Sequence, residues 1–148
     1  MSATRRTEPI PGSSQLLPAA GRSIDEILAN ARSRLRRLQP GEAHAAMLAG
    51  ALLVDTRSQA QRAAQGSVPG ALHVERNVLE WRFDLRSSTR LPQAADYGLR
   101  VIIMCAEGYS SSLAAASLQE LGLYNATDVI GGFEAWAAAS LPVCRPAL

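Results

Sequence analysis

A cysteine marks the junction between an apolar run and an alanine-rich segment in the stretch VIIMCAEGYSSSLAAASLQELG, residues 101–122. The apolar residues before Cys105 predict a buried strand, and the residues after it predict a loop that leads into a helix. A helix beginning near Ser111 would bring the positive end of its dipole, together with the N–H groups of the loop, close to the thiol. A free thiol of pKa about 8.5 is only slightly ionised at neutral pH, so this setting would favour the nucleophilic thiolate. On residue chemistry alone, a buried core cysteine is the alternative.

The surrounding segments predict an α/β fold with a mainly parallel central sheet flanked by helices on both faces. Strands are expected at residues 51–55, 72–74, 101–104 and 127–130, where apolar residues are continuous rather than alternating. Helices are expected at residues 40–50, 77–83 and 111–121 and in a last segment through Trp136. Ligands bind at the carboxyl ends of parallel strands, and Cys105 would lie at that edge.

An extra N-terminal helix is expected ahead of this domain. Ser23 and Glu26 have the spacing of a capping box, and apolar residues then recur at helical spacing, namely Ile24, Ile27, Leu28, Ala31, Leu35 and Leu38. The pattern predicts about four turns whose apolar stripe packs on the domain. The expected division of the chain is a flexible arm (1–22), the amphipathic helix (23–39), the domain (40–143) and a C-terminal tail (144–148).

Composition limits the classes of protein to which the chain can belong. Its 148 residues are 47% hydrophobic, which suits one compact domain. The longest apolar run, residues 45–54, is about half as long as a membrane span, so no membrane partner is expected. Arg5 and Arg6 are followed by polar residues rather than by the apolar core of a secretory signal. Two cysteines without zinc-type spacing favour a cytoplasmic location, a free Cys105 thiol and no metal site.

The basic residues do not predict a nucleic-acid partner. All 15 are arginines, and a group of them, Arg32, Arg34, Arg36 and Arg37, falls on one segment. Such a run is usually the solvated face of a helix, although it could touch an acidic partner. No aromatic residues interleave with these arginines, so nucleic-acid binding is not expected. We expect a monomer or a weak homodimer.

Four stretches, in order, resemble the single-domain rhodanese-like sulfurtransferase family. VIIM-CAEGYSS is similar to the family's active-site loop, in which a strand ends in Cys and a cradle of six residues, the Cys included, precedes a helix. The other three stretches are LLVDTR (52–57), GSVPGALHV (66–74) and VIGGFEAWAAASLPV (129–143), which contains the family's Gly-Gly-x-x-x-Trp pattern. The resemblance covers about residues 40–143. Because four motifs occur in order, it is far more specific than any one of them.

The resemblance implies a rhodanese-like fold and a sulfurtransferase. Cys105 corresponds to the nucleophile, which takes a sulfane sulfur from thiosulfate, a persulfide or a polysulfide and passes it to a thiol, cyanide or a protein acceptor. This double displacement through a Cys105 persulfide requires no metal or organic cofactor. The residues implied to bind substrate are those of the loop, Ala106, Glu107, Gly108, Tyr109, Ser110 and Ser111. Asp55 and Arg57 correspond to structural charges beside the site.

The departures from the family pattern leave the donor and two other functions open. The loop lacks the Arg and Lys of thiosulfate-type rhodaneses, and Ser67 replaces a common His. The related phosphatases and arsenate reductases carry an arginine where this chain has Ser111, so phosphoryl transfer would lack its usual bidentate partner. A non-enzymatic sensor or binding module built on the same fold is the third alternative.

A few further residues have competing interpretations. Cys144 is expected to be a spare tail thiol rather than one that resolves a Cys105 persulfide. Trp136 is expected in the core, and His73 is expected to be a packed histidine rather than a base. Trp81, with Arg76 and Glu80, comes from the segment after Val-Pro-Gly-Ala, and the family resemblance implies that this segment borders the mouth of the pocket.

Overall fold

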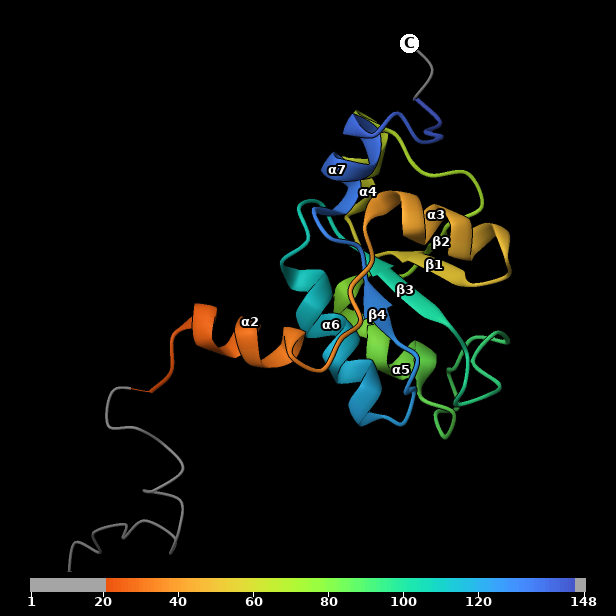
Figure 1. Ribbon diagram of the computed structural model, residues 1–148. Coiled ribbons are helices and arrows are strands. Elements are labelled where there is room, and N and C mark those ends of the chain that lie inside the picture. The colour runs from red at the N-terminus through yellow and green to blue at the C-terminus, as the bar shows by residue number, and fades with distance from the viewer. Residues whose placement is uncertain (1–20, 146–148) are drawn as a thin grey trace, which may run out of the picture.

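The computed structural model describes residues 21–145 and has a four-stranded sheet between two layers of helices (Figure 1). Its strands are β1 (Leu52–Asp55), β2 (Leu72–His73), β3 (Val101–Met104) and β4 (Thr127–Asp128). They lie in the order β2-β1-β3-β4, and each neighbouring pair is parallel. The predicted fold class is therefore confirmed. Residues 1–20 of the expected arm and residues 146–148 of the expected tail lie outside the described residues.

The helices cover both faces of the sheet. They are α2 (Ile24–Arg32), α3 (Pro40–Leu48), α4 (Gln59–Gln65), α5 (Leu79–Phe83, after a 3-10 turn at Arg76–Val78), α6 (Ser110–Glu120) and α7 (Gly132–Ala138). Helices α3 and α7 lie on one face, and α5 and α6 lie on the other (Figure 1). Helix α4 was not expected, although Ser58 and Gln61 form a capping box at its start. No helix within residues 21–145 is long and apolar enough to cross a membrane.

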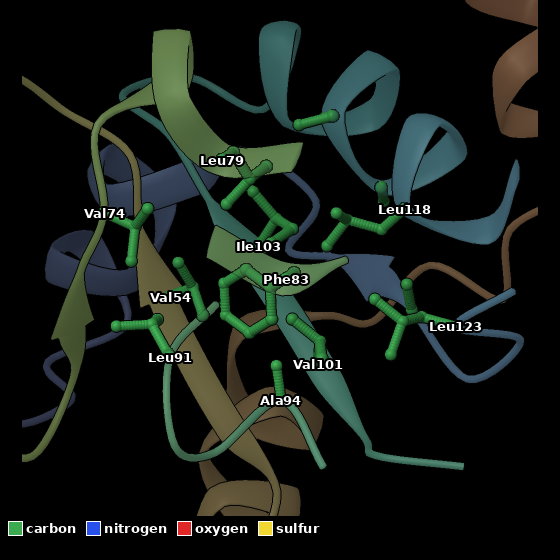
Figure 2. Close-up of a cluster of buried hydrophobic side chains, with 13 residues drawn as sticks. Val54, Val74, Leu79, Phe83, Leu91, Ala94, Val101, Ile103, Leu118 and Leu123 are labelled. Carbon is green, nitrogen blue, oxygen red and sulfur yellow. The ribbon is translucent and has the colours of Figure 1, made fainter. Parts of the chain in front are cut away.

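Both faces of the sheet are apolar, which explains the continuous hydrophobic strands. Successive side chains of a strand point to opposite faces. Val101 and Ile103 therefore pack with Leu79, Phe83 and Leu118 under α5 and α6 (Figure 2). The intervening residues Ile102 and Met104 pack with Trp136 under α3 and α7. Trp136 is fully buried, and its Nε1 donates to the carbonyl of Pro142 at 2.9 Å, so its expected place in the core is confirmed.

The expected four-turn N-terminal helix is shorter than its apolar pattern indicates. The capping box of Ser23 and Glu26 forms, but α2 ends at Arg32. Beyond it the chain runs beside β4, where the N–H of Leu38 donates to the carbonyl of Asp128 at 3.0 Å. The N–H of Ile130 in turn donates to the carbonyl of Leu38 at 2.8 Å. An isolated helix of about four turns is only marginally stable. Pairing with the sheet therefore decides the conformation of the residues that follow Arg32.

The expectation that the extension packs on the domain is confirmed. Leu28 and Ala31 are buried on the side of α2 that meets α6. Leu35, one turn beyond the end of α2, is half-buried against the core under α5 and α6. The extension therefore reaches the same helix that follows the cysteine loop.

Candidate active site

The Cys105 thiol lies where the carboxyl end of β3 meets the start of α6. Its Sγ accepts hydrogen bonds from the backbone N–H groups of Gly108, at 3.2 Å, and Ser111, at 3.3 Å. Helix α6 begins at Ser110, one residue before the expected start. Cys105 is only 6% exposed, so the loop encloses most of the sulfur. A reactant must therefore reach the sulfur through the small part of Cys105 that stays exposed.

The loop divides into residues that reach the sulfur and residues that face solvent. Of the six residues predicted to bind substrate, Gly108 and Ser111 are buried and donate to Sγ. Glu107, Tyr109 and Ser110 are exposed, and Ala106 is half-buried. The six residues thus lie together around the thiol, with the one carboxylate on the outer side.

The loop makes the Cys105 thiol more acidic than a free cysteine. Burial raises the pKa of the thiol, because it removes solvent from the thiolate. The nearby side chains of Ser111 and Ser110, and the hydrogen bonds from the backbone N–H groups of Ser111 and Gly108, stabilise the thiolate and outweigh burial. The pKa therefore lies below its usual value. The site favours an anionic sulfur at neutral pH, as a nucleophile requires.

This lowered pKa predicts the pH profile of alkylation. Only the thiolate reacts with iodoacetamide, so the rate rises with pH until the thiol is fully ionised. In the folded protein, that rise should be complete at a lower pH than for the Cys105 thiol of the denatured chain. The measurement uses the Cys144→Ser variant, so that one thiol is followed. Coincident profiles in the folded and denatured protein would show that the loop does not stabilise the thiolate.

The first turn of α7 holds the carbonyl groups at the start of the loop. The carbonyls of Cys105 and Ala106 accept from the N–H groups of Phe133, at 2.8 Å, and Glu134, at 3.0 Å. Gly132 has a φ of +61°, and a Cβ there would lie 2.4 Å from the carbonyl oxygen of Cys105. The start of α7 can therefore lie under the loop only because this residue lacks a side chain. With their carbonyls directed to α7, the loop peptides leave N–H groups available on the other side.

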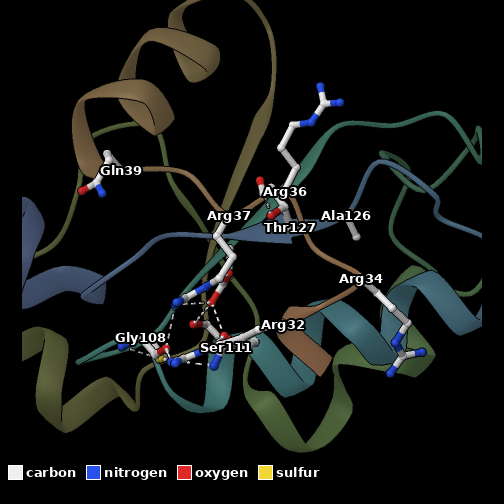
Figure 3. Close-up of polar contacts among 12 residues, drawn as sticks. Arg32, Arg34, Arg36, Arg37, Gln39, Gly108, Ser111, Ala126 and Thr127 are labelled. Carbon is white, nitrogen blue, oxygen red and sulfur yellow. Dashed lines mark hydrogen bonds and ion pairs between the residues drawn. The ribbon is translucent and has the colours of Figure 1, made fainter. Parts of the chain in front are cut away.

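A buried aspartate organises the start of α6. Asp128, at the end of β4, is fully buried and accepts from the hydroxyls of Ser111 and Ser112, each at 2.7 Å. The guanidinium of Arg37 pairs with the same carboxylate at 2.8 Å (Figure 3). Arg32 donates from Nε to the hydroxyl of Ser112 at 3.0 Å. Since a buried carboxylate is costly without partners, these contacts fix Asp128 and the first turn of α6 together.

The role of these arginines differs from the expectation for a solvated charge run. Arg32 and Arg37 face α6, whereas Arg34 and Arg36 are exposed. Sequence reasoning missed Arg32, Arg37, Ser112 and Asp128 as neighbours of the site. One signal was available, since an aspartate within the apolar run of residues 126–130 predicts a buried charge that needs a partner.

Asp55 and Arg57 form a second buried ion pair. Their side chains are fully buried and meet at 2.8 Å. The guanidinium of Arg57 also lies over the ring of Phe133, 3.7 Å from its centroid. Because the N–H of Phe133 binds the Cys105 carbonyl, this pair supports the base of the site. Its contacts are structural, in keeping with the role that the resemblance implies.

Other candidate residues lie away from the thiol. Cys144 is exposed, and its backbone pairs with that of Ser67. His73 is exposed on the short edge strand β2, so the prediction of a packed histidine is wrong.

The group of Arg76, Glu80 and Trp81 also lies away from the thiol. Glu80 binds Arg76 at 2.9 Å and Ser117 at 2.6 Å, and Ser117 is two turns along α6 from the cysteine loop. Trp81 beside Glu80 is 62% exposed, and the structure does not bring this group to Cys105. Residues 21–145 contain no cluster of three His, Cys, Asp or Glu side chains that could hold a metal ion.

Comparison with known families gives matches over most of the chain. The model of the rhodanese-like domain matches residues 39–139. The thiosulfate sulfurtransferase GlpE of Haemophilus influenzae is 32% identical over 108 residues, which are 73% of this chain and 93% of the relative. The thiosulfate sulfurtransferase GlpE of Pseudomonas fluorescens is 36% identical over 105 residues, which are 70% of this chain and 86% of the relative.

Solved structures share the fold. A Rhodopseudomonas palustris protein described as a possible tyrosine phosphatase is 30% identical, with a TM-score of 0.76 over 82% of this chain and 94% of that one. The polysulfide-sulfur transferase of Wolinella succinogenes is 22% identical, with a TM-score of 0.64 over 83% of this chain and 88% of that one. The human single-domain sulfurtransferase TSTD1 is 23% identical, with a TM-score of 0.57 over 69% of this chain and 95% of that one.

Proposed function

Because this chain belongs to the rhodanese-like domain family and is a sulfurtransferase, we propose that it transfers sulfane sulfur through a persulfide on Cys105. The family resemblance in the sequence is thereby confirmed. The observation that supports the persulfide route is the Cys105 thiol itself. It has a lowered pKa and two backbone N–H groups directed at its sulfur.

The proposed reaction consists of two displacements at sulfur. The Cys105 thiolate attacks the outer sulfur of the donor, a new S–S bond forms, and the donor's own bond to that sulfur breaks. With thiosulfate, sulfite leaves with the electron pair. A thiolate or cyanide then attacks the outer sulfur of the persulfide, and the Cys105 thiolate leaves. Each step exchanges one bond to sulfur for another, so the electrons balance without an outside oxidant or cofactor.

The loop is proposed to hold the negative charge at each stage. The N–H groups of Gly108 and Ser111 donate to Sγ, and the dipole of α6 points its positive end toward the same atom. Ala106, Glu107, Tyr109 and Ser110 complete the surface that a donor meets. Both cysteines of the chain are free thiols, which suits the reducing cytoplasm that we propose as the location of the reaction.

Phosphoryl transfer is the main rival, since a structural neighbour is described as a possible tyrosine phosphatase. Such chemistry needs a guanidinium that faces the phosphoryl oxygens. Here the corresponding position is Ser111, whose hydroxyl donates to Asp128. The guanidinium groups of Arg32 and Arg37 are bound to groups of the protein. These contacts favour sulfur transfer over phosphoryl transfer.

A parallel assay tests the proposed function. The protein is incubated with thiosulfate and cyanide, and thiocyanate is measured; a second sample receives p-nitrophenyl phosphate. We expect thiocyanate to form and p-nitrophenol not to be released above background. Release of p-nitrophenol without thiocyanate would favour the phosphatase. Inactivity in both assays, together with no sulfur on Cys105 after exposure to a persulfide donor, would favour the binding module.

Glu107 predicts a preference among donors. Thiosulfate carries two negative charges, and methanethiosulfonate carries one, although both present an outer sulfane sulfur. Because Glu107 is exposed, solvent screens its repulsion, and Glu107→Gln should raise kcat/KM for thiosulfate by about two- to fivefold at low salt. The gain with methanethiosulfonate should be smaller. Equal gains with both donors, or gains that do not shrink in high salt, would show that Glu107 does not select donors by charge.

A further inference from the structure

The carbonyl of Gly108 binds two guanidinium groups that come from outside the family domain. Arg32, at the end of α2, donates from Nη2 at 2.7 Å, and Arg37 donates from Nη2 at 3.0 Å (Figure 3). The rhodanese-like domain match begins at residue 39, so both arginines precede it. The N-terminal extension thus reaches directly to a residue of the cysteine loop.

The backbone of Gly108 carries both a donor to the thiol and the acceptor of the two arginines. Its φ is +87°, and it has no side chain that packs to fix it. Its own N–H is one of the two backbone donors to Cys105 Sγ. The peptide that follows is planar and trans, so a carbonyl that points toward the arginines directs the N–H of Tyr109 the opposite way. Rotation of these peptides would turn carbonyl oxygens, rather than N–H groups, toward an anionic sulfur.

The two arginines also anchor the second donor to the thiolate. Arg32 binds the hydroxyl of Ser112, and Arg37 binds the Asp128 carboxylate that accepts from Ser111. Each guanidinium therefore connects Gly108 with the first turn of α6. Hydrogen bonds from a charged donor are stronger than neutral ones, and the planar fork of arginine permits two at once.

We propose that Arg32 and Arg37 are positioning residues for sulfur transfer, because they hold Gly108 and the start of α6 so that both N–H groups face Cys105. The inference rests on the proposed function of Cys105. In this role the N-terminal extension maintains the geometry of the cysteine loop.

Matched arginine variants test the proposal. Arg34 and Arg36 lie on the same segment, and within residues 21–145 their side chains make no hydrogen bond or ion pair. Figure 3 shows their guanidinium groups pointing away from the cluster around Gly108. Arg32→Gln and Arg37→Gln remove one positioning group each, whereas Arg34→Gln and Arg36→Gln remove the same charge without a contact to the loop. Arg32→Gln is the primary variant, since it leaves the Arg37–Asp128 pair intact.

Two readouts are taken for each full-length variant in low and high salt. The first is the pH profile of Cys105 alkylation by iodoacetamide, which needs no sulfur donor. The second is the rate of persulfide formation with thiosulfate. For Arg32→Gln we expect the thiol pKa to rise by about half a unit to one unit and persulfide formation to slow about tenfold, in both salt conditions. Arg34→Gln and Arg36→Gln should match the wild type in high salt.

The outcomes separate positioning from general charge and from failure of the proposed function. Equal changes in all four variants, or changes in Arg32→Gln that disappear in high salt, would overturn the positioning role. So would an Arg32→Gln protein whose alkylation profile and rate match those of Arg34→Gln. If the wild type forms no persulfide, the proposed function fails, and the alkylation profiles still decide whether Arg32 positions the loop.

Discussion

Replacing Cys105 with serine is expected to abolish sulfur transfer and leave the protein folded. A serine hydroxyl is not ionised at neutral pH and cannot form a persulfide, so neither displacement can begin. The side chain is nearly isosteric, and the N–H groups of Gly108 and Ser111 still find an acceptor there. We expect thiocyanate formation at background level and a loss of stability of about 1 kcal/mol, measured by thermal unfolding.

The second cysteine supplies the control for this substitution. Cys144→Ser changes an exposed side chain whose backbone, rather than its sulfur, makes the contacts with Ser67. It should retain full activity and an unchanged melting temperature. A Cys105→Ser protein with wild-type activity would contradict the persulfide route. An inactive Cys144→Ser protein would instead assign that thiol to the transfer of sulfur from Cys105.

Gly132→Ala is expected to disrupt the cysteine loop. It should reduce kcat/KM more than a substitution at any of the exposed residues of that loop. The added Cβ would lie 2.4 Å from the carbonyl oxygen of Cys105 and 2.8 Å from the carbonyl of Ala106. These are backbone atoms, so either the loop or α7 must move. Movement breaks the hydrogen bonds from Phe133 and Glu134 that orient the loop. The thiol pKa should then rise, which alkylation measures directly.

A glycine elsewhere separates this clash from backbone strain alone. Gly50 also has a positive φ, +107°, but a Cβ there would meet no atom within 4 Å. Gly50→Ala should cost about 1 kcal/mol of stability through strain and leave the Cys105 pKa and kcat/KM unchanged. If Gly132→Ala behaves like Gly50→Ala in both alkylation and activity, the contact between α7 and the loop does not set the reactivity of the thiol.

The sequence predicts the core of the fold well, because the strands are buried on both faces. Strand β3 has the predicted bounds, residues 101–104, since each of its four residues packs on a helix layer and the loop after Cys105 cannot extend it. The N-terminal helix, by contrast, is predicted to be longer than it is. Leu35 and Leu38 continue a helical spacing, but both are half-buried beyond the end of α2, and Leu38 pairs with Val129 beside β4. Spacing alone does not show which element an apolar residue packs against.

The sequence predicts the nucleophile and its loop, but it does not predict the residues that hold the loop in place. Cys105 lies next to its own donors along the chain, so a strand, a loop and a helix are enough to predict its surroundings. Arg32 and Arg37 contact Gly108 across more than 70 residues. Their contact depends on how the extension crosses α6, which only the folded chain specifies. The same holds for Gly132. Only the folded chain shows that the loop above this residue leaves no room for a side chain.

Mass spectrometry of the protein after exposure to thiosulfate tests the Cys105 persulfide most directly. The Cys144→Ser protein is incubated with the donor, freed of it, alkylated, digested and analysed, and a second portion receives cyanide before alkylation. We expect one additional sulfur atom on the peptide that contains Cys105 and its loss as thiocyanate after cyanide is added. Thiocyanate produced at the normal rate by a protein whose Cys105 never carries the added sulfur would contradict the account.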